Sequence, residues 1–223
     1  MGTLTLVRHG QASFGSDDYD RLSPLGEAQC RRLGEYLQDK GVRFDAALVG
    51  TLRRHDQSFA ALCAGLESTP ARTDWPGLNE YDAEALVSAL EPRPALSDMA
   101  APEARRQHFR ALRNALQAWM EDSIAPPGMC RYSEFVAGVT AALDHVRQSC
   151  NGQVLLVSSG GPIATAVGQV LGMTPAATIE LNMRIRNSAI TEFVFTPKRH
   201  ALLTFNTLPH LDSAEHADWT TYA

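Results

Sequence analysis

Short apolar stretches alternate along this chain with longer stretches in which apolar residues recur at helical spacing. The first, residues 3–10, reads Thr-Leu-Thr-Leu-Val-Arg-His-Gly and predicts a buried strand that ends in Arg8 and His9. The same kind of pattern predicts strands at residues 45–49, 153–158, 188–195 and 201–205. The last two form a predicted hairpin that closes the sheet.

Helical periodicity fills most of the segments between these strands. Ser23 is placed to cap a helix that starts at Pro24, and a second helix follows the Gly50-Thr51 turn. Ser133 is the predicted cap of a third helix, and Pro162 opens a fourth. Residues 71–82 show neither periodicity and are predicted to be irregular.

The alternation of strands and helices predicts an α/β fold, a three-layer sandwich with a mostly parallel central sheet flanked by helices. From residue 83 the pattern is helical but broken by prolines, until Pro126-Pro127-Gly128 ends it. We expect one domain over residues 1–223, with a helical insertion at about 83–128 that caps the carboxyl edge of the sheet. A hydrophobic content of 44% is enough for one such core.

Composition narrows the class of protein. A formal net charge of -5 argues against a nucleic-acid coat or an anionic-membrane binder, so any anion site must be a local cluster of basic groups. The four cysteines show no Cys-x-x-Cys spacing, which indicates neither a metal site nor a disulfide framework. There is neither a long apolar span nor a secretion signal, and we expect a cytoplasmic protein.

The end of the first predicted strand carries the chemistry. Open α/β sheets bind ligands at the carboxyl ends of their strands. There Arg8 offers a planar fork of donors to phosphate oxygens, His9 offers a nucleophilic nitrogen, and Gly10 lets the backbone approach an anion. Arg54, at the start of the second helix, and the Ser159-Gly160-Gly161 turn are two further places that suit an anion.

Several motifs follow one another in order: Leu-Val-Arg-His-Gly at 6–10, Leu-Gly-Glu-Ala-Gln at 25–29, Leu-Arg-Arg-x-x-Gln-Ser at 52–58, Leu-Asn-Glu at 78–80 and Val-Ser-Ser-Gly-Gly at 157–161. Together they resemble the histidine phosphatase superfamily, with its phosphoglycerate-mutase-like fold, over nearly the whole chain. The resemblance implies that His9 takes the phosphoryl group, Arg8 and Arg54 clamp its oxygens, and Glu80 gives a proton to the leaving alcohol. It calls for no metal or cofactor, because the arginines neutralise the charge.

One departure concerns the second catalytic histidine of the family. Ser159 stands where the family has that histidine, and loss of one such donor typically costs about 100- to 1000-fold in rate. His210, in the polar tail, is the candidate to compensate. We interpret His55, His108 and His145 as structural or surface residues, because they lie in helical stretches.

The phosphate site is expected to draw further contacts from Gly10, Gln11, Ser16 and Gly160. Ser16 stands near the place of an asparagine that the family often uses to bind phosphate.

Two functions stay open on these grounds. The first is a phosphomonoester hydrolase that works through a phosphohistidine on His9, slowed by Ser159. The second is a phosphate-ester-binding or regulatory protein with little turnover. Both take a small phosphorylated compound whose identity the sequence does not give, and a homodimer is left open.

Two other activities are less favoured. A phosphoglycerate mutase needs additional basic contacts, and the insertion offers only Arg105, Arg106 and Arg110 as a dense group. A serine hydrolase built on Ser159 fails the Gly-x-Ser-x-Gly pattern, because Val157 stands in place of the first glycine.

Overall fold

A six-stranded sheet forms the centre of the structure, a computed structural model that describes residues 1–13, 20–90 and 102–222. The strands are β1 (Gly2–Arg8), β2 (Ala46–Val49), β3 (Ala71–Asp74), β4 (Gln153–Ser158), β5 (Ile190–Thr196) and β6 (Arg199–Thr207), in the order β3-β2-β4-β1-β5-β6. The first four strands in that order pair in parallel, and β5 and β6 continue the sheet antiparallel. The predicted α/β class and mostly parallel sheet are confirmed.

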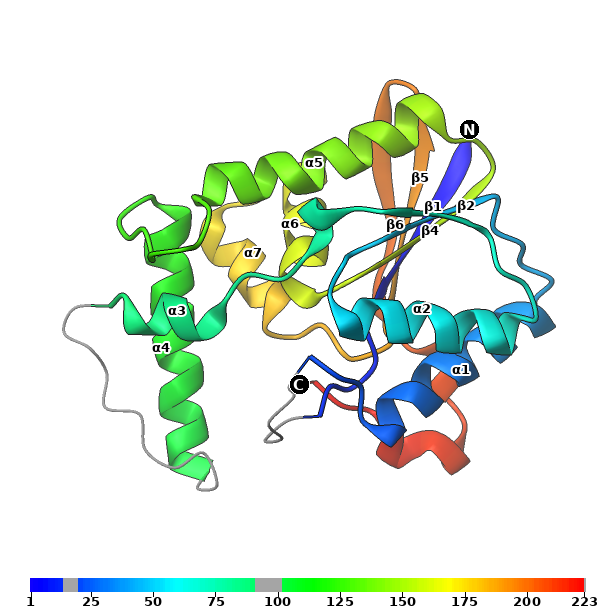
Figure 1. The fold of residues 1–223 in the computed structure, drawn as a ribbon, viewed down its shortest axis with the longest axis horizontal. Helices are drawn as coiled ribbons and strands as arrows, with labels where there is room; N and C mark the ends of the chain where they lie inside the picture. Colours follow the sequence, from blue (N-terminus) through cyan, green and yellow to red (C-terminus); the bar gives the residue numbers. More distant parts are fainter. Residues whose placement is uncertain (14–19, 91–101, 223) are drawn as a thin grey trace.

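Helices cover both faces of this sheet (Figure 1). They are α1 (Pro24–Asp39), α2 (Arg53–Leu66), α3 (Ala83–Ser88), α4 (Pro102–Met120), α5 (Tyr132–Ser149), α6 (Gly160–Leu171) and α7 (Pro175–Asn182), with 3-10 turns at Pro76–Leu78, Pro209–Leu211 and Ala214–Trp219. Figure 1 shows α1 and α2 on one side and α5 and α6 on the other, which is the predicted three-layer arrangement.

Alternate residues of the central strands enter two separate cores. Leu155 and Val157 of β4 pack with α1 and α2, whereas Val154 and Leu156 pack on the opposite face. Because β4 is buried on both faces, its sequence is a continuous apolar run rather than an alternating one. The carboxyl ends of β1 and β4 lie side by side, because the two strands pair in parallel and Arg8 is opposite Ser158.

Four local predictions differ from the structure. Helix α6 begins at Gly160, two residues before the predicted Pro162, with Ser159 as its N-cap. Residues 71–74 form the edge strand β3, whose four residues are all exposed, so no buried face leaves an apolar pattern in the sequence. Helix α5 begins two residues earlier than predicted, with Arg131 rather than Ser133 as its cap. Helix α7 was not predicted at all, although Thr174 caps it and Pro175 opens it.

The segment predicted as an insertion contains α3 and α4. Helix α4 packs against α3, α5 and α7, and its Leu116 and Trp119 side chains lie in the core. Residues 91–101 lie outside the described residues, so the role of this segment as a cap stays a prediction. Within the described part of the chain, no helix has both the length and the apolar character needed to cross a membrane.

Candidate active site

His9 lies directly after β1, at the carboxyl edge of the sheet. Its backbone N–H donates to the Ser158 carbonyl at 2.8 Å, and its ring is only 4% exposed. The Nδ1 atom is 2.7 Å from the Gly10 carbonyl oxygen, so a neutral ring donates from Nδ1 and keeps a lone pair on Nε2. Burial, followed by the charges of Arg8 and Arg54, holds the pKa of His9 well below its usual value. His9 is therefore a neutral imidazole, the form that a nucleophile needs.

Arg54 stands in the first turn of α2 with its side chain buried. Its Nη1 donates to Asp20 Oδ1 at 2.6 Å, while Asp20 Oδ2 accepts from the Arg53 backbone N–H at 2.8 Å. Asp20 thus joins the loop after β1 to the start of α2 and orients the guanidinium. The positive charge of Arg54 acts to lower the pKa of both His9 and Glu80.

The Arg8 guanidinium is held by the carboxyl-terminal part of the chain. Its Nη1 donates to the carbonyl of Ile185 and, at 2.5 Å, to that of Tyr222. The tail is itself fixed, because Thr221 accepts from the Asn187 backbone N–H at 2.9 Å. These contacts place the charge of Arg8 near His9 and Glu80, and this charge acts to lower the pKa of both groups.

Glu80 reaches the site from the loop before α3. Its Oε2 accepts from the Gly161 backbone N–H at 3.0 Å, in the first turn of α6. Burial raises the pKa of Glu80, although the Gly161 hydrogen bond and the two arginines act in the opposite direction. The protonated form is thereby favoured, which suits a general acid.

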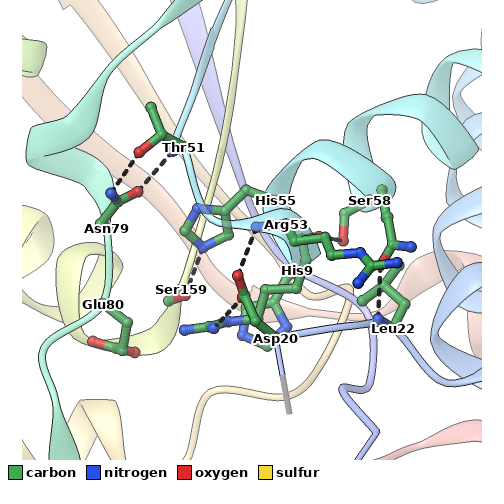
Figure 2. Close-up of polar contacts among 12 residues, drawn as sticks. His9, Asp20, Leu22, Thr51, Arg53, His55, Ser58, Asn79, Glu80 and Ser159 are labelled. Atoms are coloured by element: carbon green, nitrogen blue, oxygen red, sulfur yellow. Dashed lines mark hydrogen bonds and ion pairs between the residues drawn. The ribbon is translucent and has the colours of Figure 1, made fainter. Parts of the chain in front are cut away.

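A hydrogen-bonded brace holds this loop against the turn that precedes α2. Asn79 Nδ2 donates to Thr51 Oγ1 at 2.6 Å, and the Thr51 backbone N–H donates to Asn79 Oδ1 at 2.7 Å (Figure 2). This brace is not predictable from the sequence, because the two residues lie in separate loops.

The residues predicted to bind phosphate divide into two groups. A Cβ on Gly10 would lie 2.1 Å from the Gly26 carbonyl oxygen, so this glycine is needed for packing against α1, and its contact with phosphate stays a prediction. The Gln11 side chain accepts from Ser23 Oγ at 2.8 Å and so holds the start of α1.

A Cβ on Gly160 would lie 2.7 Å from Asn182 Oδ1 and 3.9 Å from Arg8 Nε, so this glycine also stands in a close-packed place, next to Arg8. Its contact with phosphate stays a prediction. Ser16 lies outside the described residues.

His210 and His55 do not lie where the sequence-based interpretation expects them. His210 is buried next to α1, where its Nε2 is 2.9 Å from Ser188 Oγ, and the nearby Arg32 is one cause of its lowered pKa. His55, interpreted as structural, instead has its Nε2 2.7 Å from Ser159 Oγ. Its ring centroid lies 5.9 Å from that of His9. The imidazole near Ser159 therefore comes from His55, whereas His210 contacts Ser188, and a compensating role for His210 stays a prediction.

A signal for His55 was present but weak. It follows Arg54 in the first helical turn after a strand, at the sheet edge to which the other candidate residues were assigned. Periodicity could not show whether the ring points into the protein or toward the site.

The structure brings together His9, Glu80 and Ser159 from three separate segments (Figure 2). Arg54, from a fourth segment, is close enough for its charge to lower the pKa of His9 and oppose the rise in that of Glu80. A neutral imidazole, fixed positive charge and a carboxyl with a raised pKa are groups that suit phosphoryl transfer to a nitrogen. Among residues 1–13, 20–90 and 102–222, no three or more His, Cys, Asp or Glu side chains gather as metal ligands would.

Comparison with known proteins gives the same family from sequence. A family model described as "Histidine phosphatase superfamily (branch 1)" matches residues 4–208. A 2,3-bisphosphoglycerate-dependent phosphoglycerate mutase of Nitratidesulfovibrio vulgaris is 26% identical over 211 residues, which cover 82% of this chain and 83% of the mutase. The enzyme of that name from Thermobifida fusca is 36% identical over 95 residues, which cover 39% and 38% of the two chains.

Solved structures show the same fold. Phosphoserine phosphatase from Entamoeba histolytica, in complex with 3-phosphoglyceric acid, matches with a TM-score of 0.66 at 20% identity, over 95% of this chain and 100% of that one. A mycobacterial glucosyl-3-phosphoglycerate phosphatase matches with a TM-score of 0.63 at 20% identity, over 93% and 99%. At these identities the likeness concerns the fold.

Proposed function

The chain belongs to the histidine phosphatase superfamily, and from this we propose that it is a phosphomonoester hydrolase acting through a phosphohistidine on His9. One observation carries the proposal. The His9 imidazole is buried beside the charge of Arg54, with its Nδ1 committed to the Gly10 carbonyl and its Nε2 left as the nucleophile.

The reaction has two steps. Arg54 and Arg8 bind the phosphate oxygens, and His9 Nε2 attacks phosphorus while the bond to the leaving oxygen breaks. Glu80 gives its proton to that oxygen, so an alcohol leaves. Water then attacks the phosphohistidine, the Glu80 carboxylate takes a proton from it, and phosphate is released with His9 neutral again.

The substrate class is a small phosphomonoester. The relatives with similar sequence are named as phosphoglycerate mutases, and those with similar folds include phosphoserine and glucosyl-3-phosphoglycerate phosphatases. We favour a hydrolase over a mutase, because a mutase needs additional basic contacts to retain and turn its intermediate.

Hydrolysis of an aryl phosphate tests the proposal with His9→Ala and, as matched control, His108→Ala on α4. We expect His9→Ala to lose at least about 1000-fold in kcat/KM, as nucleophile removal does in other enzymes, with His108→Ala unchanged. A rapid-quench experiment on the wild type should trap an acid-labile phosphoryl group on His9. Equal activity of the wild type and His9→Ala would overturn the proposal.

Ser159 favours a second candidate, a protein that binds phosphate esters with little turnover. A neutral hydroxyl supplies a hydrogen bond but no charge at this position. Under this alternative the wild type binds a phosphate ester, hydrolyses it no faster than His9→Ala, and gains turnover in Ser159→His.

A further inference from the structure

The contact between His55 and Ser159 is the feature of the site that the two-step reaction does not use. His55 lies in the first turn of α2, and Ser159 is the N-cap residue of α6, directly before Gly160. Both side chains are fully buried, and His55 Nε2 is 2.7 Å from Ser159 Oγ. Figure 2 shows the pair next to His9, whose ring centroid is 5.9 Å from that of His55.

The hydroxyl hydrogen of Ser159 is committed in one of the two neutral forms of the His55 ring. The His55 Nδ1 edge lies against Gly50, whose backbone acts to raise the pKa of His55, and within the described part of the chain Nδ1 has no hydrogen-bond partner, so a neutral ring can carry its proton on that nitrogen. The lone pair is then on Nε2, and Ser159 donates its one hydrogen to it. In this state Ser159 has no hydrogen to offer an anion.

Burial, with a smaller contribution from positive charge, favours the neutral form of His55 in the ligand-free protein. Burial, followed by the charge of Arg54, lowers the pKa of His55 to about 3. Other ionisable groups near the pair are His9 and Arg8 at the end of β1, and Glu80, whose carboxyl reaches the first turn of α6. Asp20 is paired with the Arg54 guanidinium. A phosphoryl dianion seated on His9 would add negative charge within this group and favour a protonated imidazole.

We propose that His55 and Ser159 form a proton-coupled contact for the phosphoryl group. When the anion binds, His55 Nε2 takes a proton from solvent and donates it to Ser159 Oγ, and the hydroxyl hydrogen of Ser159 turns to a phosphoryl oxygen. No other bond forms or breaks. The proposal rests on the proposed function, since it places the phosphoryl group on His9.

The two residues have different roles in this contact. Ser159 touches the anion, whereas His55 acts through Ser159 and is a positioning residue. Together they supply a hydrogen bond and a positive charge at the β4–α6 turn, where Ser159 stands in place of a histidine.

The first test is the NMR titration of the histidine Cε1–H groups between pH 3 and pH 8, with and without saturating sulfate. Sulfate is chosen because its own charge is constant over this range. His55→Gln identifies the His55 resonance. We expect sulfate to raise the pKa of His55 by at least two units and to leave that of His210 unchanged.

Ser159→Ala separates a contact through the hydroxyl from a general electrostatic effect. We expect the sulfate-induced rise in the pKa of His55 to shrink by at least half in this variant and sulfate affinity to fall about tenfold or more. An equal rise in Ser159→Ala would show that His55 responds through space, and it would overturn the proposal.

Kinetics provides the second test. The Gln side chain in His55→Gln can still donate to Ser159 but cannot take a proton. We expect kcat/KM for an aryl phosphate to fall about tenfold or more, and the part of its pH profile that follows His55 to vanish. Full wild-type kinetics in His55→Gln would contradict the proposal.

Failure of this inference is distinguishable from failure of the proposed function. If the wild type binds sulfate and hydrolyses aryl phosphate in a His9-dependent manner while His55 does not titrate, the proton-coupled contact is wrong and the hydrolase stands. If the wild type neither binds sulfate nor hydrolyses the ester, both are wrong.

Discussion

Two strand ends meet at the candidate site, and they supply its chemistry in different ways. At the end of β1 the reactive groups, Arg8 and His9, are consecutive residues of one motif. At the β4–α6 turn the chain supplies a hydroxyl and a backbone N–H, while the titratable groups come from elsewhere. Ser159 is paired with His55, 104 positions away, and Gly161 with Glu80, 81 positions away.

The difference shows which kinds of site a motif can reveal. A nucleophile and its neighbouring arginine stay together in sequence, because one strand end presents both. A proton donor needs only to reach the same place in space, and α2 and the loop before α3 both do so. The predictions below separate the two strand ends experimentally.

Glu80→Gln should produce the largest effect at the β4–α6 turn. Without a proton to give, we expect kcat for an alkyl phosphate to fall by about 100- to 10,000-fold, the usual range for a general acid. An ester with a good leaving group, such as 4-nitrophenyl phosphate, should lose much less. Steady-state kinetics on both esters measures this, and equal losses would show that Glu80 does not protonate the leaving group.

Ser159 and His55 can be exchanged to test whether the site needs an imidazole at one place or the other. We expect Ser159→Ala to lose about 100-fold in kcat/KM, as removal of one oxyanion donor does. The double variant with His55→Ala and Ser159→His puts the imidazole in the turn itself and should recover most of this loss. Activity of the double variant below that of Ser159→Ala would contradict the idea that the two arrangements are equivalent.

The pH dependence of stability should distinguish a site histidine from a structural one. His55 and His210 both have a pKa lowered to about 3, in each case mainly by burial. In the unfolded chain each takes a proton as the pH falls below about 6.5, whereas in the folded protein each stays neutral. The stability they provide is therefore present above pH 6.5 and is lost as the pH falls toward 3, by about 1.4 kcal/mol per histidine per pH unit.

Urea unfolding at pH 6 and pH 5, with and without sulfate, measures this loss. If His55 becomes protonated in the complex, sulfate should stabilise the protein more at pH 5 than at pH 6. His210→Asn should reduce the pH dependence of stability in both conditions, because the His210 ring contacts Ser188 and not Ser159. A sulfate stabilisation that does not change between the two pH values would count against protonation of His55.

The sequence predicted the fold well, and it placed Arg8 and His9 at the end of β1, for a physical reason. Buried parallel strands are apolar on both faces, so β1, β2 and β4 stand out, and their order with the helices gives the sheet. The exposed edge strand β3 has no buried face and left no such pattern.

The contact of His55 with Ser159 could not be read from the sequence in the same way. Helical periodicity assigned His55 to a helix but does not give the direction of its side chain within the first turn. The prediction favours His210 instead, because C-terminal tails in the fold that the sequence resembles can fold back over the site, and the pattern does not give side-chain direction in a polar tail either.

Asn79→Ala is expected to give the smallest effect, since it changes only the position of Glu80. The variant removes both hydrogen bonds of the brace with Thr51, and each such bond is worth about 1 kcal/mol. We expect the free energy of unfolding to drop by about 1 to 2 kcal/mol and kcat for an alkyl phosphate to fall severalfold, with KM nearly unchanged. Urea unfolding and steady-state kinetics measure the two effects.

Thr51→Ala is the matched control for this variant, because it removes the Thr51 hydroxyl but keeps the backbone N–H that donates to Asn79. It should lose about half as much stability as Asn79→Ala. If Asn79→Ala lowered kcat equally for alkyl and aryl esters, the brace would be positioning His9 or Arg54 as well as Glu80. The loop that carries Glu80 to the β4–α6 turn would then also position groups at the end of β1. The two strand ends would be less independent than their contacts indicate.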